Sequence, residues 1–245
     1  MTDSQPTSPS PSPARAGEVI AITRDISATF AAGLERIHLV IERDGALAAA
    51  DKALLVAVAA ANRGRDELMS AELTRARTLG IGGADADGAG LALLLARGEA
   101  AFADFARAAK RIFGERADVR GGGHAAAAPT SPAQALDYFR EHFGGEVPLR
   151  QRVFAEIAPL AFEGYQLMHR AALKENPLSA KTVELVMCSI NASDYQGAFL
   201  EIHIAGARSL GAGESEIAEA VLCAIPAAGI AVWPGAAEAI IRTRS

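Results

Sequence analysis

Aromatic residues are scarce in this sequence of 245 residues: they make up 5% of it, with a single tryptophan. Stretches in which β-branched residues alternate with polar ones, the pattern of a half-buried strand, are nearly absent. Alanine, the best helix former, supplies much of the apolar half of the composition. The sequence therefore predicts an all-α fold with a sizeable core.

Long apolar runs are missing as well. The most apolar window, residues 218–233, is shorter than the roughly 20 residues of a membrane span and contains Glu219 and Pro226. We expect no membrane partner, and we expect Pro226 to bend or interrupt its helix. Residues 1–18 are rich in Ser and Pro and hold no apolar region like that of a secretory signal, so we interpret them as a disordered tail of a cytoplasmic protein.

Clustered positive charge, paired cysteines and metal-binding histidine spacings are also lacking. The net charge is −5 and the basic residues are scattered, so nucleic acid is not an expected partner. Only two cysteines occur, Cys188 and Cys223, each in an apolar helical run typical of buried thiols. No H-x-x-x-H or H-E-x-x-H spacing exists among the histidines, so we expect no metal site. The five histidines are His38, His124, His142, His169 and His203.

What the sequence does contain is a repeat. Shifted by 131 residues, it matches itself without a gap, and such a long period indicates duplicated domains. The matches include Gly33 with Gly164, His38 with His169, Leu47 with Leu178, Leu54 with Leu185, and Ala76, Arg77, Leu79 and Gly80 with Ala207, Arg208, Leu210 and Gly211. We predict two helical halves, residues 19–116 and 150–245, joined by a linker with a short helix, residues 117–149.

The second half predicts a helical bundle. One amphipathic helix is expected over residues 153–174 and the next over residues 180–191. Asn191, Ser193 and Asp194 are candidates to cap the following helix, which carries His203 and ends at Gly211. On that helix Gln196, Phe199 and His203 share one face.

At this face the sequence resembles the carboxymuconolactone decarboxylase family, which includes the alkyl hydroperoxidase D-type peroxidases. The resemblance is carried by residues 162–185, by the pattern H-x-x-x-A-x-x-x-G followed by GESEIAEAVL from His203 to Leu222, and by the turn at Pro234. It implies an alkyl hydroperoxidase D-like helical bundle in two tandem repeats. The first repeat has Arg65, Leu68 and Glu72 at the corresponding face, so we expect it to serve as scaffold.

The sequence departs from the peroxidases of that family. They carry C-x-x-C-x-x-x-H, and the two cysteine positions are Gln196 and Phe199 here, neither of which can form a thiolate. The resemblance is therefore to the cysteine-free members. It implies a lyase that decarboxylates a small carboxylated or lactone-type metabolite of aromatic catabolism without a cofactor, or a related isomerase or hydrolase. An alkyl hydroperoxidase or peroxiredoxin-type antioxidant activity is disfavoured by the missing cysteines. A non-catalytic oligomeric protein is the third possibility.

Such a lyase needs a proton carrier, hydrogen-bond donors for an enolate oxygen and a cation for the substrate carboxylate. The candidate catalytic residues are His203, Gln196, Tyr195 and Glu201. The candidates for substrate binding are Phe199, Trp233, Arg170 and Arg208. Structural roles stay open for several of them: Tyr195 could fix a helix end, and Arg208, matched by Arg77, could form a structural ion pair.

Two further expectations concern the pocket around His203 and the association of the chain with other copies. We expect His203 in a pocket lined by apolar side chains of the helices at 180–191 and 217–232, with Trp233 at its rim. The resemblance also implies a homo-oligomer, because single-repeat members build rings from paired subunits. A tandem repeat supplies one such pair, so we expect a trimer first and a hexamer second.

Overall fold

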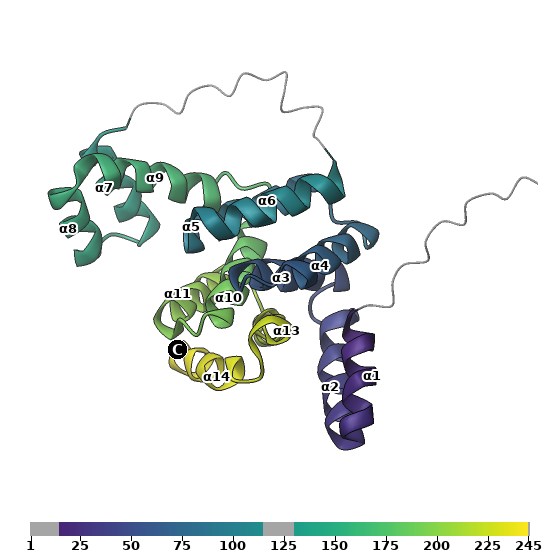
Figure 1. Cartoon of the computed structure of the whole chain (residues 1–245). Coiled ribbons are helices and arrows are strands. Elements are labelled where there is room, and N and C mark those ends of the chain that lie inside the picture. The colour runs from purple at the N-terminus through teal and green to yellow at the C-terminus, as the bar shows by residue number, and fades with distance from the viewer. Residues whose placement is uncertain (1–14, 115–129, 245) are drawn as a thin grey trace, which may run out of the picture.

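A computed structural model describes residues 15–114 and 130–244, which are helical throughout and contain no strand (Figure 1). The all-α prediction is confirmed. No helix within these two ranges is long and apolar enough to cross a membrane. The first half comprises α1 (Arg15–Ile26), α2 (Ala28–Glu42), α3 (Ala49–Asn62), α4 (Asp66–Thr78), α5 (Gly83–Arg97) and α6 (Glu99–Phe113). The second comprises α7 (Pro132–His142), α8 (Leu149–Ile157), α9 (Pro159–Leu173), α10 (Ala180–Ser193), α11 (Gly197–Ser209), α12 (Glu214–Leu222), α13 (Ile225–Ala228) and α14 (Val232–Arg242).

The helix bounds repeat with the spacing found in the sequence. The helices α2, α3 and α4 begin at residues 28, 49 and 66, and α9, α10 and α11 begin at 159, 180 and 197, a difference of 131 each time. The turn after α3 contains Gly64 at φ 61°, and the equivalent turn after α10 contains Tyr195 at φ 57°. A left-handed residue other than glycine is uncommon, so the duplicated turn imposes its backbone on a tyrosine.

The two halves pack against each other through α3 and α10, whose small and aliphatic side chains form the centre of one core. Equivalent residues meet at this contact. The Asn62 amide donates to the Ser193 hydroxyl at 2.8 Å, and Arg63 pairs with Asp194 at 3.4 Å. Each pair is 131 residues apart, so both lie close to the axis that relates the halves.

The helix α5 of the first half corresponds to two helices in the second. It spans residues 83–97, whereas α12 and α13 are separated at Cys223 and Ala224 within the equivalent stretch. The break precedes Pro226, which has no N–H for an α-helical hydrogen bond. The predicted interruption at Pro226 is confirmed.

Two expectations about helix ends were wrong. The single helix over 153–174 is instead α8 and α9, because Ala158 precedes Pro159 and is held outside the helical region at φ −138°, ψ 66°. The N-cap of α11 is Gln196, without a side-chain cap, and not Asn191, Ser193 or Asp194. Those three side chains are used elsewhere: Asn191 and Ser193 bond back within α10, and Asp194 pairs with Arg63 and Arg97.

The division into domains remains a prediction. The predicted tail, residues 1–18, lies outside the described residues up to residue 14, and α1 begins at Arg15, within that span. The linker is described only from residue 130, where it forms α7. The helices α7, α8 and α9 make a second, smaller core of Ala135, Phe139, Val147 and Phe162, at one end of the molecule in Figure 1.

Candidate active site

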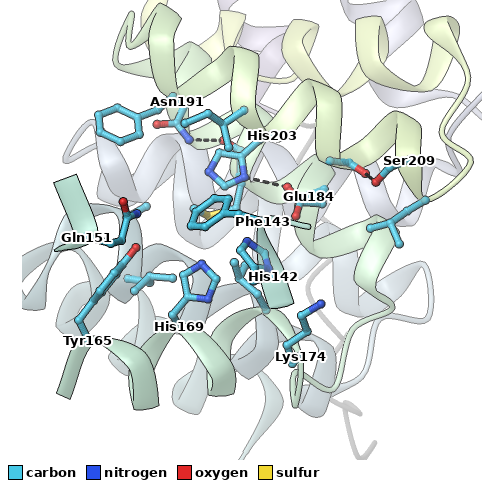
Figure 2. A pocket seen from close by; sticks show the side chains of 18 of the residues that line it. His142, Phe143, Gln151, Tyr165, His169, Lys174, Glu184, Asn191, His203 and Ser209 are labelled. Atoms are coloured by element: carbon cyan, nitrogen blue, oxygen red, sulfur yellow. Dashed lines mark hydrogen bonds and ion pairs between the residues drawn. The ribbon is translucent and has the colours of Figure 1, made fainter. Parts of the chain in front are cut away.

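A pocket of about 530 Å³ lies between the small core of α7 to α9 and the large core. Its walls come from α10 and α11 on one side, from α7, α8 and α9 on the other, and from the end of α5. Three histidines from three helices line it: His142, His169 and His203 (Figure 2).

His203 is held by a carboxylate from the neighbouring helix. Its Nδ1 lies 2.7 Å from Oε2 of Glu184 on α10, and the His203 side chain is 11% exposed. Since a carboxylate only accepts hydrogen bonds, Nδ1 carries the proton and Nε2 is the nitrogen left for a ligand. This is the arrangement of a histidine oriented for proton transfer.

Gly206 makes room for this contact. It lies one turn after His203 on α11, and a Cβ at this position would stand 2.8 Å from the Glu184 carboxyl carbon. Any larger residue would push the carboxylate away from the helix and from the imidazole. A glycine inside a helix costs stability, and here it permits the close approach of Glu184.

His169 is a neutral imidazole. Burial, together with the neighbouring His142 and His203, lowers its pKa to about 3. Its Nδ1 is hydrogen bonded at 2.8 Å to the hydroxyl of Tyr138, whose pKa burial raises to about 12, so both partners keep their protons near neutral pH. The ring of His142 packs edge-on against His169 at 4.7 Å, and burial lowers the pKa of His142 too.

Three buried polar atoms of lining residues have no hydrogen-bond partner in the described parts of the chain: Nε of Arg97, Nδ1 of His142 and Oε1 of Gln151. Gln151 is 5% exposed and its side chain reaches the Tyr165 hydroxyl through its other polar atom. A buried acceptor without a partner is costly, so such atoms indicate where a bound molecule or water donates.

Positive charge prevails around the pocket. Arg97, Arg150 and Lys174 line it, and the one carboxylate among the lining residues, Glu184, is engaged with His203. Arg97 is paired with Asp194 at 3.1 Å. For Arg150 and Lys174, the ranges 15–114 and 130–244 contain no ion-pair partner, and Arg150 lies over the Phe143 ring. The pocket therefore favours an anionic ligand.

Of the residues predicted for the site, the structure brings His203 and Phe199 to the pocket. Tyr195 is half exposed, and its hydroxyl donates to the carbonyl of Ala228 at 2.5 Å. Gln196 is exposed at the start of α11. Neither lines the pocket.

The remaining candidates are occupied elsewhere. Glu201 pairs with Arg242 of α14 at 3.0 Å, and Arg170 pairs with Glu175 at 3.1 Å. Arg208 bonds Glu214 at 2.6 Å and Thr243 at 2.5 Å, the structural ion pair that the sequence left open. Trp233 is 38% exposed and does not line the pocket.

The expectation that residues 217–232 form one wall of the pocket was wrong. Helix α10 lines the pocket as predicted, but residues 217–232 do not. Their apolar side chains face the large core instead, where α12 and α13 pack against α10 and α3. The opposite wall comes from α7, α8 and α9, with the end of α5.

Sequence reasoning missed Glu184 and the part that His142, His169 and Lys174 play in the pocket. The match of His169 with His38 suggested packing alone, and His142 lies in the predicted linker. One signal was present: His203 and Gly206 are three residues apart on one helix face, which marks a close approach beside the histidine.

Neither thiol lies at the pocket. Cys188 and Cys223 are buried in the large core, and burial raises the pKa of both. Within the described ranges no group of three or more His, Cys, Asp or Glu side chains is placed to hold a metal ion.

Residues 159–242 match the profile of the carboxymuconolactone decarboxylase family. The chain carries a carboxymuconolactone decarboxylase domain. This domain runs from the start of α9 to the end of α14, about a third of the chain, and its family has the all-α alkyl hydroperoxidase D-like fold. No curated protein matches the chain. The carboxymuconolactone decarboxylase domain supplies His203 and Glu184, whereas His142, Gln151 and Arg97 lie outside the matched residues.

Proposed function

We propose that the pocket binds a small carboxylated molecule and that His203 transfers a proton to it in a decarboxylation that needs no cofactor. The observation that carries this proposal is the part-buried pair of His203 and Glu184, 2.7 Å apart, in a pocket that Arg150 and Lys174 also line. The family of residues 159–242 supports a lactone-type substrate.

The reaction follows from these groups. The bond between the carboxylate carbon and the ring carbon breaks, its electron pair passes into a conjugated lactone carbonyl, and CO₂ leaves. The dienolate oxygen carries the negative charge, which Lys174 or Arg150 stabilises in the pocket. His203, in its protonated form, then gives a proton from Nε2 to the ring carbon, while Glu184 keeps the imidazole oriented and stabilises its positive charge. Solvent returns the proton to His203.

The buried polar atoms without a partner indicate which further group the substrate carries. Oε1 of Gln151 calls for a donor on the side of the ligand that faces α7 and α8, and Nδ1 of His142 calls for a partner of either kind, according to its tautomer. A hydroxyl group opposite the anionic group of the substrate would donate its one proton to Oε1 of Gln151 and would accept from Nδ1 of His142 in the tautomer that carries its proton there. These two residues lie outside residues 159–242, which match the family. Helices α7 and α8, which precede the matched residues, would therefore select the substrate.

The dithiol peroxidase alternative has little support. Gln196 and Phe199 stand at the positions of the reactive cysteines, and the two buried thiols have raised pKa values. A non-catalytic role is opposed by Glu184, whose side chain is only 14% exposed, because a carboxylate with so little contact with water is expensive unless it serves the imidazole.

The experiment compares three proteins: the natural chain, His203→Gln, and the double variant Cys188→Ser with Cys223→Ser. CO₂ release and deuterium uptake from D₂O are measured with carboxylated γ-lactones, and peroxide consumption is measured in parallel. We expect His203→Gln to lower CO₂ release by about 10²- to 10⁴-fold and the double serine variant to keep most of it. Circular dichroism verifies the fold of each protein. Peroxide consumption that the serine variant loses, or CO₂ release that His203→Gln retains, contradicts the proposal.

A further inference from the structure

A second cavity, of about 790 Å³, lies in the first repeat. Its walls are formed by α1, α2 and α4, together with α13 and the residues after it. In Figure 1 the pair α1 and α2 lies on the opposite side of the molecule from α7 to α9. Its lining is apolar apart from His38 and Arg65.

This cavity is the first repeat's copy of the His203 pocket. Five of its lining residues lie 131 positions from residues that line the other pocket. The pairs are Val19 with Arg150, Leu34 with Tyr165, His38 with His169, Leu68 with Phe199, and Pro226 with Leu95. The duplication therefore produced two equivalent cavities, one in each half.

The copy has lost the proton-transfer pair. Ala53 occupies the position of Glu184, and Glu72 occupies the position of His203. Glu72 is bonded to Arg75, the residue at the position of Gly206, so it does not act as a free acid or base. The positions of Arg150 and Tyr165 hold Val19 and Leu34, which makes the cavity apolar.

The cavity has nevertheless stayed open. A half that served only as scaffold would be expected to fill the space with larger side chains, since protein interiors are close-packed. Instead Phe30 and Ile230 line an open space and are 67% and 62% exposed. Leaving such apolar surface towards water forgoes roughly 25 cal/mol for each Å² that burial would remove. Apolar surface of this kind marks binding sites.

The charge of the lining indicates the ligand. Arg65 is exposed on the cavity wall, and the described parts of the chain offer it no ion-pair partner. His38 is bonded to Glu42 at 3.2 Å, so any charge on it is compensated. The lining therefore presents a large apolar surface with one unpaired cation. Its volume falls within the roughly 300–1,000 Å³ of small-molecule sites.

We propose that this cavity is a second ligand site, which binds a small molecule with an apolar body and one anionic group, such as a medium-chain carboxylate. The apolar body lies between α2 and α4, and the anionic group pairs with Arg65. The site is separate from the His203 pocket and does not depend on the chemistry proposed there.

Gly33 offers a way to fill the cavity without disturbing the fold. It lines the cavity from α2, and a Cβ there would meet nothing within 4 Å. Gly33→Leu therefore places a side chain in the cavity, and leucine favours the helix over glycine. The matched control is Gly164→Leu, at the equivalent position of α9, which also has open space and does not line the His203 pocket.

The test measures binding of decanoate and of decanol, which lacks the charge, to the full chain by titration calorimetry. We expect one decanoate per chain in this cavity, a loss of affinity of at least about tenfold in Gly33→Leu, and no loss in Gly164→Leu. Arg65→Gln is expected to weaken decanoate by about threefold to fivefold, as for an exposed ion pair, and to leave decanol unchanged.

Three outcomes would overturn the proposal. Decanoate binding that Gly33→Leu retains at full affinity would place the ligand outside this cavity. If decanoate does not bind at millimolar concentration, the cavity does not take ligands with an apolar body and one anionic group. A change of molecular mass in Gly33→Leu, seen by light scattering, together with no binding to the natural chain, would show that a second copy fills the cavity.

Discussion

The imidazole of His203 is hydrogen bonded through its Nδ1 to the Glu184 carboxylate. That contact decides which nitrogen faces the pocket, and so which nitrogen can exchange a proton with a substrate. The neighbouring His169 has a different environment, since it is hydrogen bonded to a phenol and kept neutral by burial. The two histidines therefore differ in their hydrogen-bond partners, a carboxylate for His203 and a phenol for His169.

Replacement of Glu184 by Gln should change the tautomer of His203. A carboxylate accepts only, whereas an amide can also donate, so the preference for a proton on Nδ1 weakens in Glu184→Gln. Nitrogen chemical shifts of the imidazole measure this. Glu201→Gln, which alters a carboxylate on the same helix that pairs with Arg242, is the control and should leave the shifts unchanged. Identical spectra for the natural chain and Glu184→Gln would refute the assignment.

His169 should make stability depend on pH. Its pKa is about 3 in the folded chain, below the roughly 6.5 of an unfolded chain, so the unfolded state binds more protons in between. The stabilisation is complete above about pH 6.5 and is lost as the pH falls towards 3. Between about pH 7 and pH 5 the free energy of unfolding should fall by about 2 kcal/mol from this group.

Urea unfolding at a series of pH values measures that loss. In His169→Gln the part due to this imidazole disappears, so the free energy of unfolding should fall less steeply between about pH 7 and pH 5. Equal slopes for the two proteins would show that His169 is not kept neutral in the folded chain.

At the scale of the elements, one carboxylate joins the repeats. Glu219 of α12 accepts hydrogen bonds from the backbone N–H groups of Ala46 and Leu47, ahead of α3, and from Lys52 within α3. Lys52 is 1% exposed, so its ammonium depends on this partner and on the Val40 carbonyl. The equivalent junction in the other half is neutral: the Asn176 amide donates to the Gly88 carbonyl at 2.9 Å.

Glu219→Ala should therefore lower the free energy of unfolding by about 3–5 kcal/mol, because it leaves a buried ammonium without its counter-charge. Urea unfolding at neutral pH is the measurement. Glu216→Ala provides the comparison, since Glu216 lies on the same helix, caps it at Gly213 and pairs with Lys181 nearer the surface. Its loss should cost only about 1 kcal/mol. Similar losses in the two variants would mean that Lys52 finds another partner.

At the scale of the whole molecule, the two halves expose apolar residues at equivalent corners. Ile26 ends α1 and Ile157 ends α8, and they are 82% and 76% exposed. Leu160, beside Ile157, is 81% exposed. Large apolar groups gathered at such corners are typical of contacts between subunits.

The expected homo-oligomer should depend on these corners. We predict a trimer, with a mass three times the 25.4 kDa of one chain, or a hexamer. The double variant Ile26→Lys with Ile157→Lys should shift the mass towards 25.4 kDa, because each charge would be buried in an interface. Light scattering at micromolar concentration measures both proteins. A natural chain that is monomeric at that concentration would contradict the prediction.

Much of this molecule could be predicted from the order of its residues. Alanine-rich periodic segments predicted helices, the offset of 131 predicted two equivalent halves, and Pro226 predicted a break. The helices and the break are local properties that depend on neighbours within a few turns, and the repeat follows from comparing the sequence with itself. The same holds for the absence of a cysteine pair ahead of His203.

The composition of the two pockets was decided only by tertiary structure. Glu184 is 19 residues from His203 and meets it because α10 and α11 pack together. His142 reaches the pocket because α7 packs on α9 in a separate small core, which helix periodicity alone does not reveal. Tyr195, Glu201 and Arg208 lie near His203 in sequence but found partners on other helices. A side chain's position in sequence fixes its face on a helix, whereas the packing of helices decides which faces meet.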